Sequence, residues 1–330
     1  MTSATRRLRR GISAAAVATV TTGIALSLAG TASAAPTGRV VVDAGQLIVT
    51  GTNRADNIAL SVPAADTSMV EVDFGNGTAK RTVKRADFNQ IQVSSRRGND
   101  VVRIDYGAEV QPFTIIDTGD GNDSVFGGSG NELFRTGAGN DSVDGNRGSD
   151  TALLGNGNDT FTWDPGDGSD VIEGGRSQDT MVFNGSAAAE RFVASANGRR
   201  LRFTRDVGNI VMDTDNVERI KLNALGGADT ITVGDLRRTD VRKVDVDLGA
   251  QLNTGGGDAA VDAITVTGTP GSDLARVSGS PGNVRVSGLS AEVRLSDAEP
   301  TDQLTVDTLA GRDRVATGRL AANVIGLTIL

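Results

Sequence analysis

Acidic residues recur every nine positions in the middle of the chain, inside turns rich in glycine and asparagine. From Thr118 to Val182 the residues fit seven rows of the template Gly-Gly-x-Gly-x-Asp-x-U-x, where U is apolar, with Trp163 and Asp164 as an insertion. Position six holds Asp123, Glu132, Asp141, Asp150, Asp159, Asp170 and Asp179. Position eight holds Val125, Phe134, Val143, Ala152, Phe161, Ile172 and Met181. The pattern predicts a series of tight turns that each carry one carboxylate.

Carboxylates repeated in this register can bind a hard cation. If two rows form one coil, each turn stacks on the turn two rows later at about 4.8 Å, the spacing of paired strands. Two ionised carboxylates at that distance repel by roughly 1 kcal/mol in water and about 3.5 kcal/mol at an effective dielectric constant of 20. Ca²⁺ suits such a place because it takes about six to eight oxygens from carboxylates and backbone carbonyls. One edge would carry Asp123, Asp141, Asp159 and Asp179, and the other Glu132, Asp150 and Asp170.

The elements that must position these carboxylates are short strands joined by glycine turns. Glycine tolerates the positive φ values and close backbone approach that tight turns need. The apolar residue at position eight would point inward from a strand that follows each turn. The predicted fold class is therefore all-β, a parallel β-roll or β-helix solenoid.

This stretch resembles the RTX, or hemolysin-type calcium-binding, repeat of secreted bacterial proteins. The resemblance implies calcium ions between successive turns, held by the position-six Asp and by carbonyls of turn residues. Glu132 and the Ser177–Gln178 pair depart from the pattern, so we expect about five inter-turn sites at most, with the Glu132–Asp150 pair the weakest. Carried onto this chain, the implied calcium-binding residues are Gly119, Gly121, Asp123, Gly137, Gly139, Asp141, Gly148, Asp150, Gly155, Gly157, Asp159, Gly166, Gly168, Asp170 and Asp179.

The chain begins with the pattern of a secretory signal peptide, residues 1–34. Four arginines between Arg6 and Arg10 precede an apolar stretch, and Ala32-Ser33-Ala34 is a cleavage site of the A-x-A type. The general secretory route is favoured over the twin-arginine route, and no other segment is apolar enough to span a membrane. The predicted localisation is therefore secreted, or extracellular. Loss of residues 1–34 takes the net charge from −8 to −12, which disfavours nucleic-acid binding.

Missing residue types exclude several kinds of site. The chain contains no Cys and no His, so Ser-His-Asp and Cys-His catalytic sites and the common zinc sites are excluded. An exported chain without disulfides needs another way to stabilise its fold, and a metal ion could supply it. With 43 glycines and 3% aromatic residues, the composition fits a turn-rich solenoid better than a thick globular core.

The regions around the array repeat at a longer period. A unit U-x-G-[ST]-x-x-x-[DE] ends at Asp56, Glu190 and Asp273, and a second unit ends in Gly-x-Asp at Asp100, Asp229 and Asp313. The predicted organisation is a β module at 35–117, the array at 118–182, and β modules at 183–265 and 266–330. The modules are either coils of the same solenoid, which we favour, or small β-sandwiches. We interpret their turn aspartates as simple turn carboxylates in preference to calcium ligands.

The function favoured by these features is that of a secreted, non-enzymatic calcium-binding repeat protein, with calcium-dependent folding and a structural or adhesive role. Calcium ions are its expected partners, and a cell-surface or polysaccharide ligand is a further candidate. The alternative is a polysaccharide-active β-helix enzyme, such as a lyase, epimerase or glycosidase. Trp163 either caps the core, which is favoured, or contacts a ligand at the surface. The apolar strand at 324–330 either tucks under its neighbours or supports oligomerisation.

Overall fold

The computed structural model describes residues 38–75, 77, 79–107, 109–252 and 255–330. Within these ranges every regular element is a strand, apart from two short 3-10 turns, η1 (Arg85–Asp87) and η2 (Val207–Asn209). The all-β prediction is therefore confirmed. The described segments contain no helix that is both long and apolar enough to cross a membrane. The predicted signal peptide, residues 1–34, lies outside the described residues.

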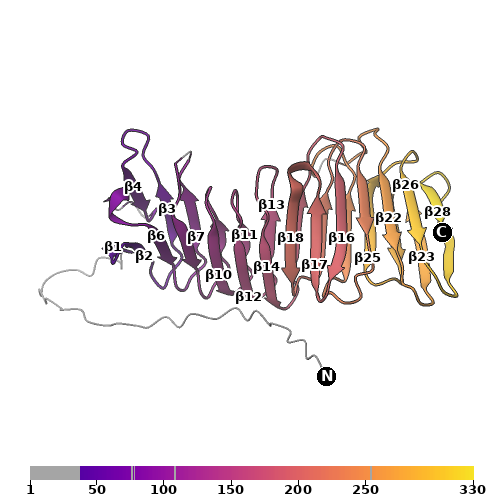
Figure 1. Ribbon diagram of the computed structural model, residues 1–330, viewed down its shortest axis with the longest axis horizontal. Coiled ribbons are helices and arrows are strands. Elements are labelled where there is room, and N and C mark those ends of the chain that lie inside the picture. Colours follow the sequence, from indigo (N-terminus) through magenta and orange to yellow (C-terminus); the bar gives the residue numbers. More distant parts are fainter. Residues whose placement is uncertain (1–37, 76, 78, 108, 253–254) are drawn as a thin grey trace, which may run out of the picture. The chain divides into compact units, whose positions relative to one another are not determined.

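The strands of the described residues form two sheets of 14 strands each, and both sheets run along the length of the stack (Figure 1). In spatial order, the first sheet, sheet A, contains β1 (Arg39–Asp43), β2 (Gln46–Thr50), β6 (Gln90–Ser94), β8 (Phe113–Asp117), β10 (Glu132–Ala138), β12 (Thr151–Asn156), β14 (Val171–Arg176), β18 (Ile210–Asp215), β17 (Arg200–Arg205), β16 (Arg191–Asn197), β20 (Thr230–Val233), β22 (Ala263–Thr267), β26 (Gln303–Asp307) and β28 (Gly326–Ile329).

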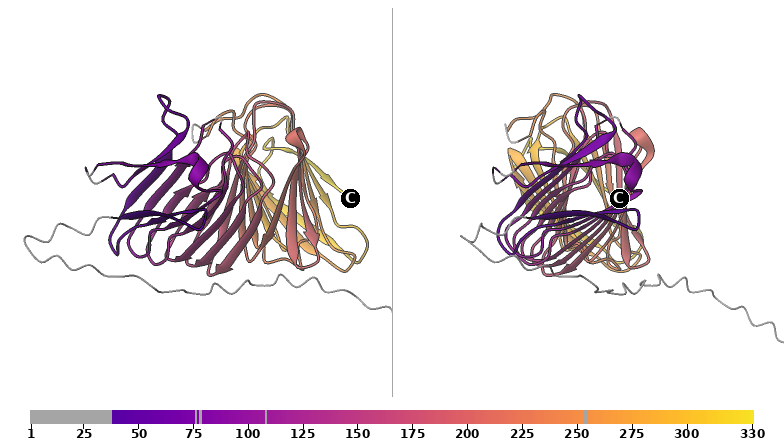
Figure 2. Two further views of the ribbon diagram at one scale, coloured as in Figure 1. Left: turned by 60° about the vertical axis from the view of Figure 1, so that its left-hand side comes forward. Right: turned by 90° about the vertical axis from the view of Figure 1, so that its left-hand side faces the viewer.

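The second sheet, sheet B, faces sheet A across a shared interior, as the end-on view in Figure 2 shows. In spatial order it contains β27 (Arg314–Leu320), β23 (Leu274–Ser280), β24 (Gly282–Ser287), β25 (Glu292–Ala298), β21 (Lys243–Asp247), β19 (Arg219–Asn223), β15 (Thr180–Asn184), β13 (Thr160–Trp163), β11 (Ser142–Asp144), β9 (Ser124–Phe126), β7 (Val101–Asp105), β3 (Asn57–Ser61), β4 (Met69–Asp73) and β5 (Arg81–Lys84).

In the nonapeptide stretch, successive strands alternate between the two sheets and pair in parallel with the strand one coil away. Val143 of β11 lies opposite Val125 of β9 and Phe161 of β13, so position-eight residues stack on one another. All seven position-eight side chains are fully buried. The parallel pairing and the inward direction of position eight confirm the predicted two-row coil, since a register error of one residue would turn this apolar row to solvent.

The flanking regions belong to the same two sheets. In each, the strand before the first repeated unit pairs in parallel with the strand before the Gly-x-Asp unit: β2 with β6, β15 with β19, and β22 with β26. Between them the chain makes a three-stranded antiparallel meander: β3–β4–β5, β16–β17–β18 or β23–β24–β25. The flanks are therefore longer coils of the same solenoid, and each contains one such meander. The module boundaries given above stay predictions.

Trp163 lies in the core, so the surface-contact alternative is wrong. Its side chain is fully buried, and its ring stacks on Phe183 with centroids 4.1 Å apart and planes 2° apart. Its indole N–H donates to the carbonyl oxygen of Gly168 at 2.7 Å. The Arg205 guanidinium lies 5.2 Å from the ring centroid. The insertion that carries Trp163 therefore places a large side chain where the narrow array meets the first downstream meander.

Candidate calcium site

The position-six aspartates of the first edge form a ladder that links successive coils. Each backbone N–H donates to Oδ1 of the Asp one coil further on: Asp123 to Asp141 at 2.8 Å, Asp141 to Asp159 at 2.8 Å, and Asp159 to Asp179 at 2.9 Å. This edge is the one at which the chain passes from sheet A to sheet B. The predicted grouping of these four residues on one edge is confirmed.

The opposite edge carries a shorter ladder of the same kind. The Glu132 N–H donates to Asp150 Oδ1 at 2.7 Å, and the Asp150 N–H donates to Asp170 Oδ1 at 2.9 Å. The repeat period therefore puts carboxylates in register on both edges, as expected. In each case Oδ1 satisfies a buried backbone donor, which is a structural role that needs no ion.

The second carboxylate oxygen has no such role. Each of the six array aspartates is at most 2% exposed, and the Oδ2 atom of each has no hydrogen-bond partner. None of the six forms an ion pair with a lysine or arginine within the described part of the chain. Burying an unpaired carboxylate oxygen is costly, so these atoms must be neutralised by a proton or by a cation. The six are Asp123, Asp141, Asp150, Asp159, Asp170 and Asp179.

Backbone carbonyls of neighbouring turns stack against the turn glycines. A Cβ placed on Gly139 would lie 1.8 Å from the Gly121 carbonyl oxygen, and one on Gly157 would lie 1.6 Å from that of Gly139. On the second edge, a Cβ on Gly168 would lie 1.3 Å from the Gly148 carbonyl oxygen. Only glycine permits this approach. The result is a row of carbonyl oxygens beside each row of carboxylates.

The remaining glycines of the predicted set divide into two groups. Gly119, Gly137 and Gly155 have positive φ and stack in the same way, each against a carbonyl of the preceding coil. Gly166 also has positive φ, but a Cβ there would meet nothing within 4 Å. Gly166 follows the Trp163–Asp164 insertion and lies outside the stacked row, whereas Gly168 of the same turn stays in it.

The two departures from the repeat have visible consequences. Both carboxylate oxygens of Glu132 are satisfied, because Oε2 accepts the Gly128 N–H at 3.1 Å and Oε1 accepts from the Gln111 side chain. Glu132 therefore ends its ladder with no unpaired oxygen, and the weakness of the Glu132–Asp150 pair stays a prediction. Ser177 occupies the fourth position of its row at φ 91°, a conformation that favours glycine.

Asparagine side chains on the first edge form a further ladder, which was not anticipated from the sequence. Asn140 donates its backbone N–H to Asn122 Oδ1 at 2.7 Å, and Asn158 donates to Asn140 Oδ1 at 2.8 Å. These bonds run in the opposite direction to those of the aspartates, so adjacent side chains in each turn reach to opposite coils. The recurrence of Asn at position five was the signal that could have revealed it.

Burial raises the pKa of the array aspartates. It raises the pKa of Asp141 to about 6, and a further contribution comes from the neighbouring Asp159 carboxylate. Burial raises the pKa of Asp170 and of Asp179 to about 7. On the second edge, burial and then the Glu132 carboxylate raise the pKa of Asp150 to about 9. Without a cation, these carboxyl groups therefore keep their protons to a higher pH than an exposed aspartate does.

Oxygen ligands of two kinds meet at these turns. The described residues hold no group of three or more His, Cys, Asp or Glu side chains that could bind a metal on their own. An ion at a turn must therefore combine carboxylate oxygens with backbone carbonyls. Such an all-oxygen set, with unpaired carboxylate oxygens already buried, fits a hard cation of the calcium type.

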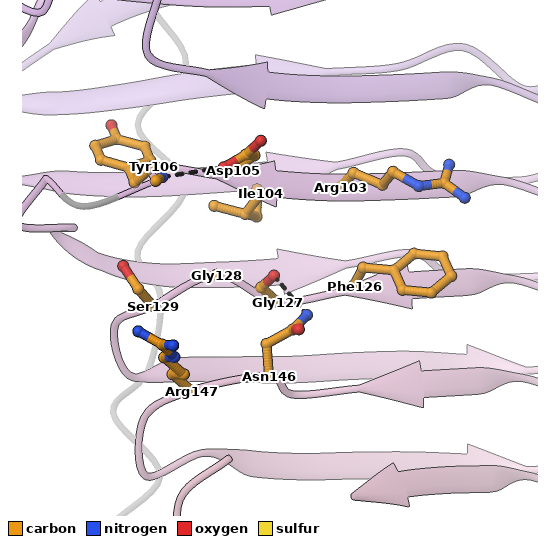
Figure 3. Close-up of a pocket in the computed structure, with 11 residues that line it drawn as sticks. Arg103, Ile104, Asp105, Tyr106, Phe126, Gly127, Gly128, Ser129, Asn146 and Arg147 are labelled. Carbon is orange, nitrogen blue, oxygen red and sulfur yellow. Dashed lines mark hydrogen bonds between the residues drawn. The ribbon is translucent and has the colours of Figure 1, made fainter. Parts of the chain in front are cut away.

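A pocket of about 370 Å³ lies beside the start of the second ladder, between the turns that follow β7, β9 and β11 (Figure 3). Asp105 is the one carboxylate among the residues that line it, and it accepts the Gly107 N–H at 3.0 Å. Asn146 donates its side-chain amide to the Gly127 carbonyl at 3.0 Å. The pair of facing carboxylates that most glycosidases use is not found in this lining.

Comparison with known families supports the sequence pattern. A family model described as RTX calcium-binding nonapeptide repeat (4 copies) matches residues 115–131, 126–161 and 166–185. This stretch therefore carries RTX repeats, and these repeats bind calcium ions. No curated protein matches the chain.

Proposed function

From the RTX calcium-binding nonapeptide repeats in residues 115–185, we propose that this calcium-binding repeat protein is exported and uses Ca²⁺ to complete its fold. We propose further that it is non-enzymatic and has a structural or adhesive role outside the cell. The observation that carries the proposal is the set of six buried aspartates whose Oδ2 atoms have no partner. A cation at each turn would remove the cost of that arrangement.

The proposed ligands are the position-six aspartates and the carbonyls of stacked turn glycines. On the first edge these are Asp123, Asp141, Asp159 and Asp179, and on the second edge Asp150 and Asp170. Bound calcium supplies positive charge between coils. The Oδ1 atoms keep their backbone hydrogen bonds, so each carboxylate links two coils through one oxygen and would bind the ion through the other.

The free energy involved is large enough to act as a folding switch. Extracellular calcium modules bind with dissociation constants of about 0.1–1 mM. At about 1 mM calcium and an affinity of about 0.1 mM, each site contributes roughly 1.4 kcal/mol. Five independent sites would approach about 7 kcal/mol, comparable with the whole stability of a domain. The array would then be loose in a calcium-poor cytoplasm and ordered outside the cell.

The extracellular role rests on the predicted signal peptide, residues 1–34. An adhesive role is supported by the alternation along the strands, which leaves the polar side chains of both sheets facing outward. A cell-surface or polysaccharide ligand would bind these outer faces. Oligomerisation through the strand β28 stays a prediction that sedimentation at several concentrations would test.

The test is a calcium titration of the mature chain, residues 35–330, followed by far-UV circular dichroism and calorimetry. Trp163 is the single tryptophan, and it bonds to a turn of the array, so its fluorescence reports on this region. We expect a cooperative gain of β-structure, several ions bound, and burial of Trp163. The control is the same titration with magnesium and with excess chelator. An array equally folded in calcium and in chelator would overturn the folding switch and favour the polysaccharide-active enzyme.

A further inference from the structure

Downstream of the RTX repeats, the second edge of the solenoid carries another ladder of carboxylates. The Glu190 N–H donates to Asp229 Oδ1 at 2.8 Å, the Asp229 N–H to Asp262 Oδ1 at 2.8 Å, and the Asp262 N–H to Asp302 Oδ1 at 3.1 Å. The spacing between members is about 33 to 40 residues, because meanders and a long loop replace the nine-residue rows. None of these residues lies in the matched repeats.

The two inner members of this ladder each have an unpaired oxygen. Asp229 and Asp262 are 1% exposed, and neither Oδ2 atom has a hydrogen-bond partner. The two outer members are satisfied locally. Glu190 accepts the Ser186 N–H and pairs with Arg205, and Asp302 accepts the Glu299 N–H at 2.7 Å through Oδ2. The unpaired oxygens are therefore confined to the centre of the ladder.

The loop between β21 and β22 brings a further carboxylate near this part of the ladder. Asp258 reaches across to the preceding coil, where its Oδ2 accepts the Gly227 N–H at 2.7 Å, while its Oδ1 accepts the Ala260 N–H at 2.8 Å. Its carboxylate lies close enough to raise the pKa of both Asp229 and Asp262. No lysine or arginine of the described segments forms an ion pair with any of the three.

We propose that Asp229 and Asp262, together with backbone carbonyls of their turns, form a calcium site that is separate from the RTX array. Asp229 would then be a calcium ligand and not the simple turn carboxylate expected from the sequence. The two buried Oδ2 atoms supply the unpaired oxygens, and Asp258 adds negative charge nearby without being a ligand. The chemistry selects a hard divalent cation, because every available donor is oxygen and the local charge is negative.

A proton is the competitor of the cation at this site. Burial, followed by the neighbouring carboxylates, raises the pKa of Asp229 to about 8 and that of Asp262 to about 7. Burial therefore disfavours the charged form of both carboxyl groups unless a cation is bound. A calcium ion would then bind in coils whose sequence lacks the nonapeptide pattern.

The experiment counts calcium ions bound to the mature chain by equilibrium dialysis and titration calorimetry. In the variant with Asp229→Asn and Asp262→Asn, the amide oxygen can still accept the backbone N–H, but the charge and the free acceptor are lost. We expect this variant to bind one ion fewer than the wild type. A variant with Asp141→Asn and Asp159→Asn, in the array, should lose array ions and retain the downstream one.

The matched control is Asp313→Asn, because Asp313 Oδ1 accepts the Asp273 N–H at 2.8 Å in the same way but has no buried unpaired oxygen. Its bound-ion count should equal that of the wild type. Circular dichroism checks that each variant folds, and the single variant Asp262→Asn serves as a second variant should the double one fail. An unchanged ion count in these variants would overturn the downstream site and leave the array untouched.

Discussion

At the scale of the residue, the two oxygens of each array carboxylate do different things. Oδ1 of Asp141 accepts the Asp123 N–H of the preceding coil, whereas its Oδ2 is buried without a partner. The first contact accounts for the occurrence of Asp in a tight stack of turns, because it satisfies a buried donor. The second is unfavourable without a cation. One side chain thus combines a structural hydrogen bond with a free ligand atom.

The substitution Asp141→Asn separates these two roles. The Asn oxygen can keep the hydrogen bond, while the amide group replaces the ligand oxygen. We expect the free energy of unfolding in about 1 mM calcium to fall by roughly 1.4 kcal/mol for each ion lost, with no loss of stability in chelator. Urea denaturation under both conditions measures this. Asp144→Asn in the same coil is the control, since Asp144 accepts the Asn146 N–H and has no buried unpaired oxygen. Equal losses in calcium and in chelator would contradict the ligand role.

The raised pKa values predict opposite pH dependences with and without calcium. Because burial raises the pKa of Asp170 and Asp179 to about 7, protonation stabilises the folded, calcium-free chain. That stabilisation is complete below about pH 4 and is lost as the pH rises through about 7. Calcium needs the ionised form, so its contribution grows over the same interval. We therefore expect the calcium-induced rise in Tm to be larger at pH 8 than at pH 5, as calorimetry can measure. An increment that does not change with pH would argue against carboxylate ligands at these turns.

At the scale of the element, the turns of the array depend on glycine at particular positions. The carbonyl oxygens of one coil occupy the space that a side chain on the next coil would need. In the flanking coils, the glycine of each Gly-x-Asp unit makes the same close approach to the preceding coil. The unit that precedes each meander also has a shared structure. Thr52, Ser186 and Thr269 each donate their N–H to the acid four residues later, which closes the end of a ladder. Gly128 and Glu132 form the same contact at the start of the array's second ladder.

The substitution Gly157→Ala tests how tightly the turns are stacked. Gly157 has φ 142°, and a Cβ there would lie 1.6 Å from the Gly139 carbonyl oxygen. We expect the free energy of unfolding in calcium to fall by about 3 kcal/mol or more, measured by urea denaturation. The control is Gly198→Ala in the β16–β17 turn, where φ is 70° and nothing lies within 4 Å, with an expected cost of about 1 kcal/mol. Similar losses for both variants would show that the array turns can separate without cost.

At the scale of the whole described unit, the array and its flanks share two continuous sheets and one hydrophobic core. β8 before the array pairs with β10, and β15 pairs with β19 of the downstream flank. Aromatic packing continues across the second junction, from Trp163 through Phe183 to Phe203. In a stack where each coil contacts mainly its neighbours, ions that order one coil support the next. Calcium-dependent folding of the array is therefore expected to extend into the flanks.

The nine-residue repeat by itself determined the register, the two edges and the inward row of apolar residues. This was possible because each property depends on residues within one or two rows, and the rows repeat without a shift. Position six and position eight could be assigned from the sequence for the same reason. The identification of RTX repeats rested on those positions alone.

Only the tertiary structure decided which oxygens stay unpaired, where Trp163 lies and how the flanks join the stack. These outcomes depend on contacts between residues about 18 to 40 positions apart, whose spacing is irregular outside the array. Asp262 is preceded by Ala260 at the position where the repeat has glycine, so the sequence does not mark it. It joins the ladder because parallel pairing of β20 with β22 places it beside Asp229. Pairing between distant strands, and not local sequence, brings those carboxylates together.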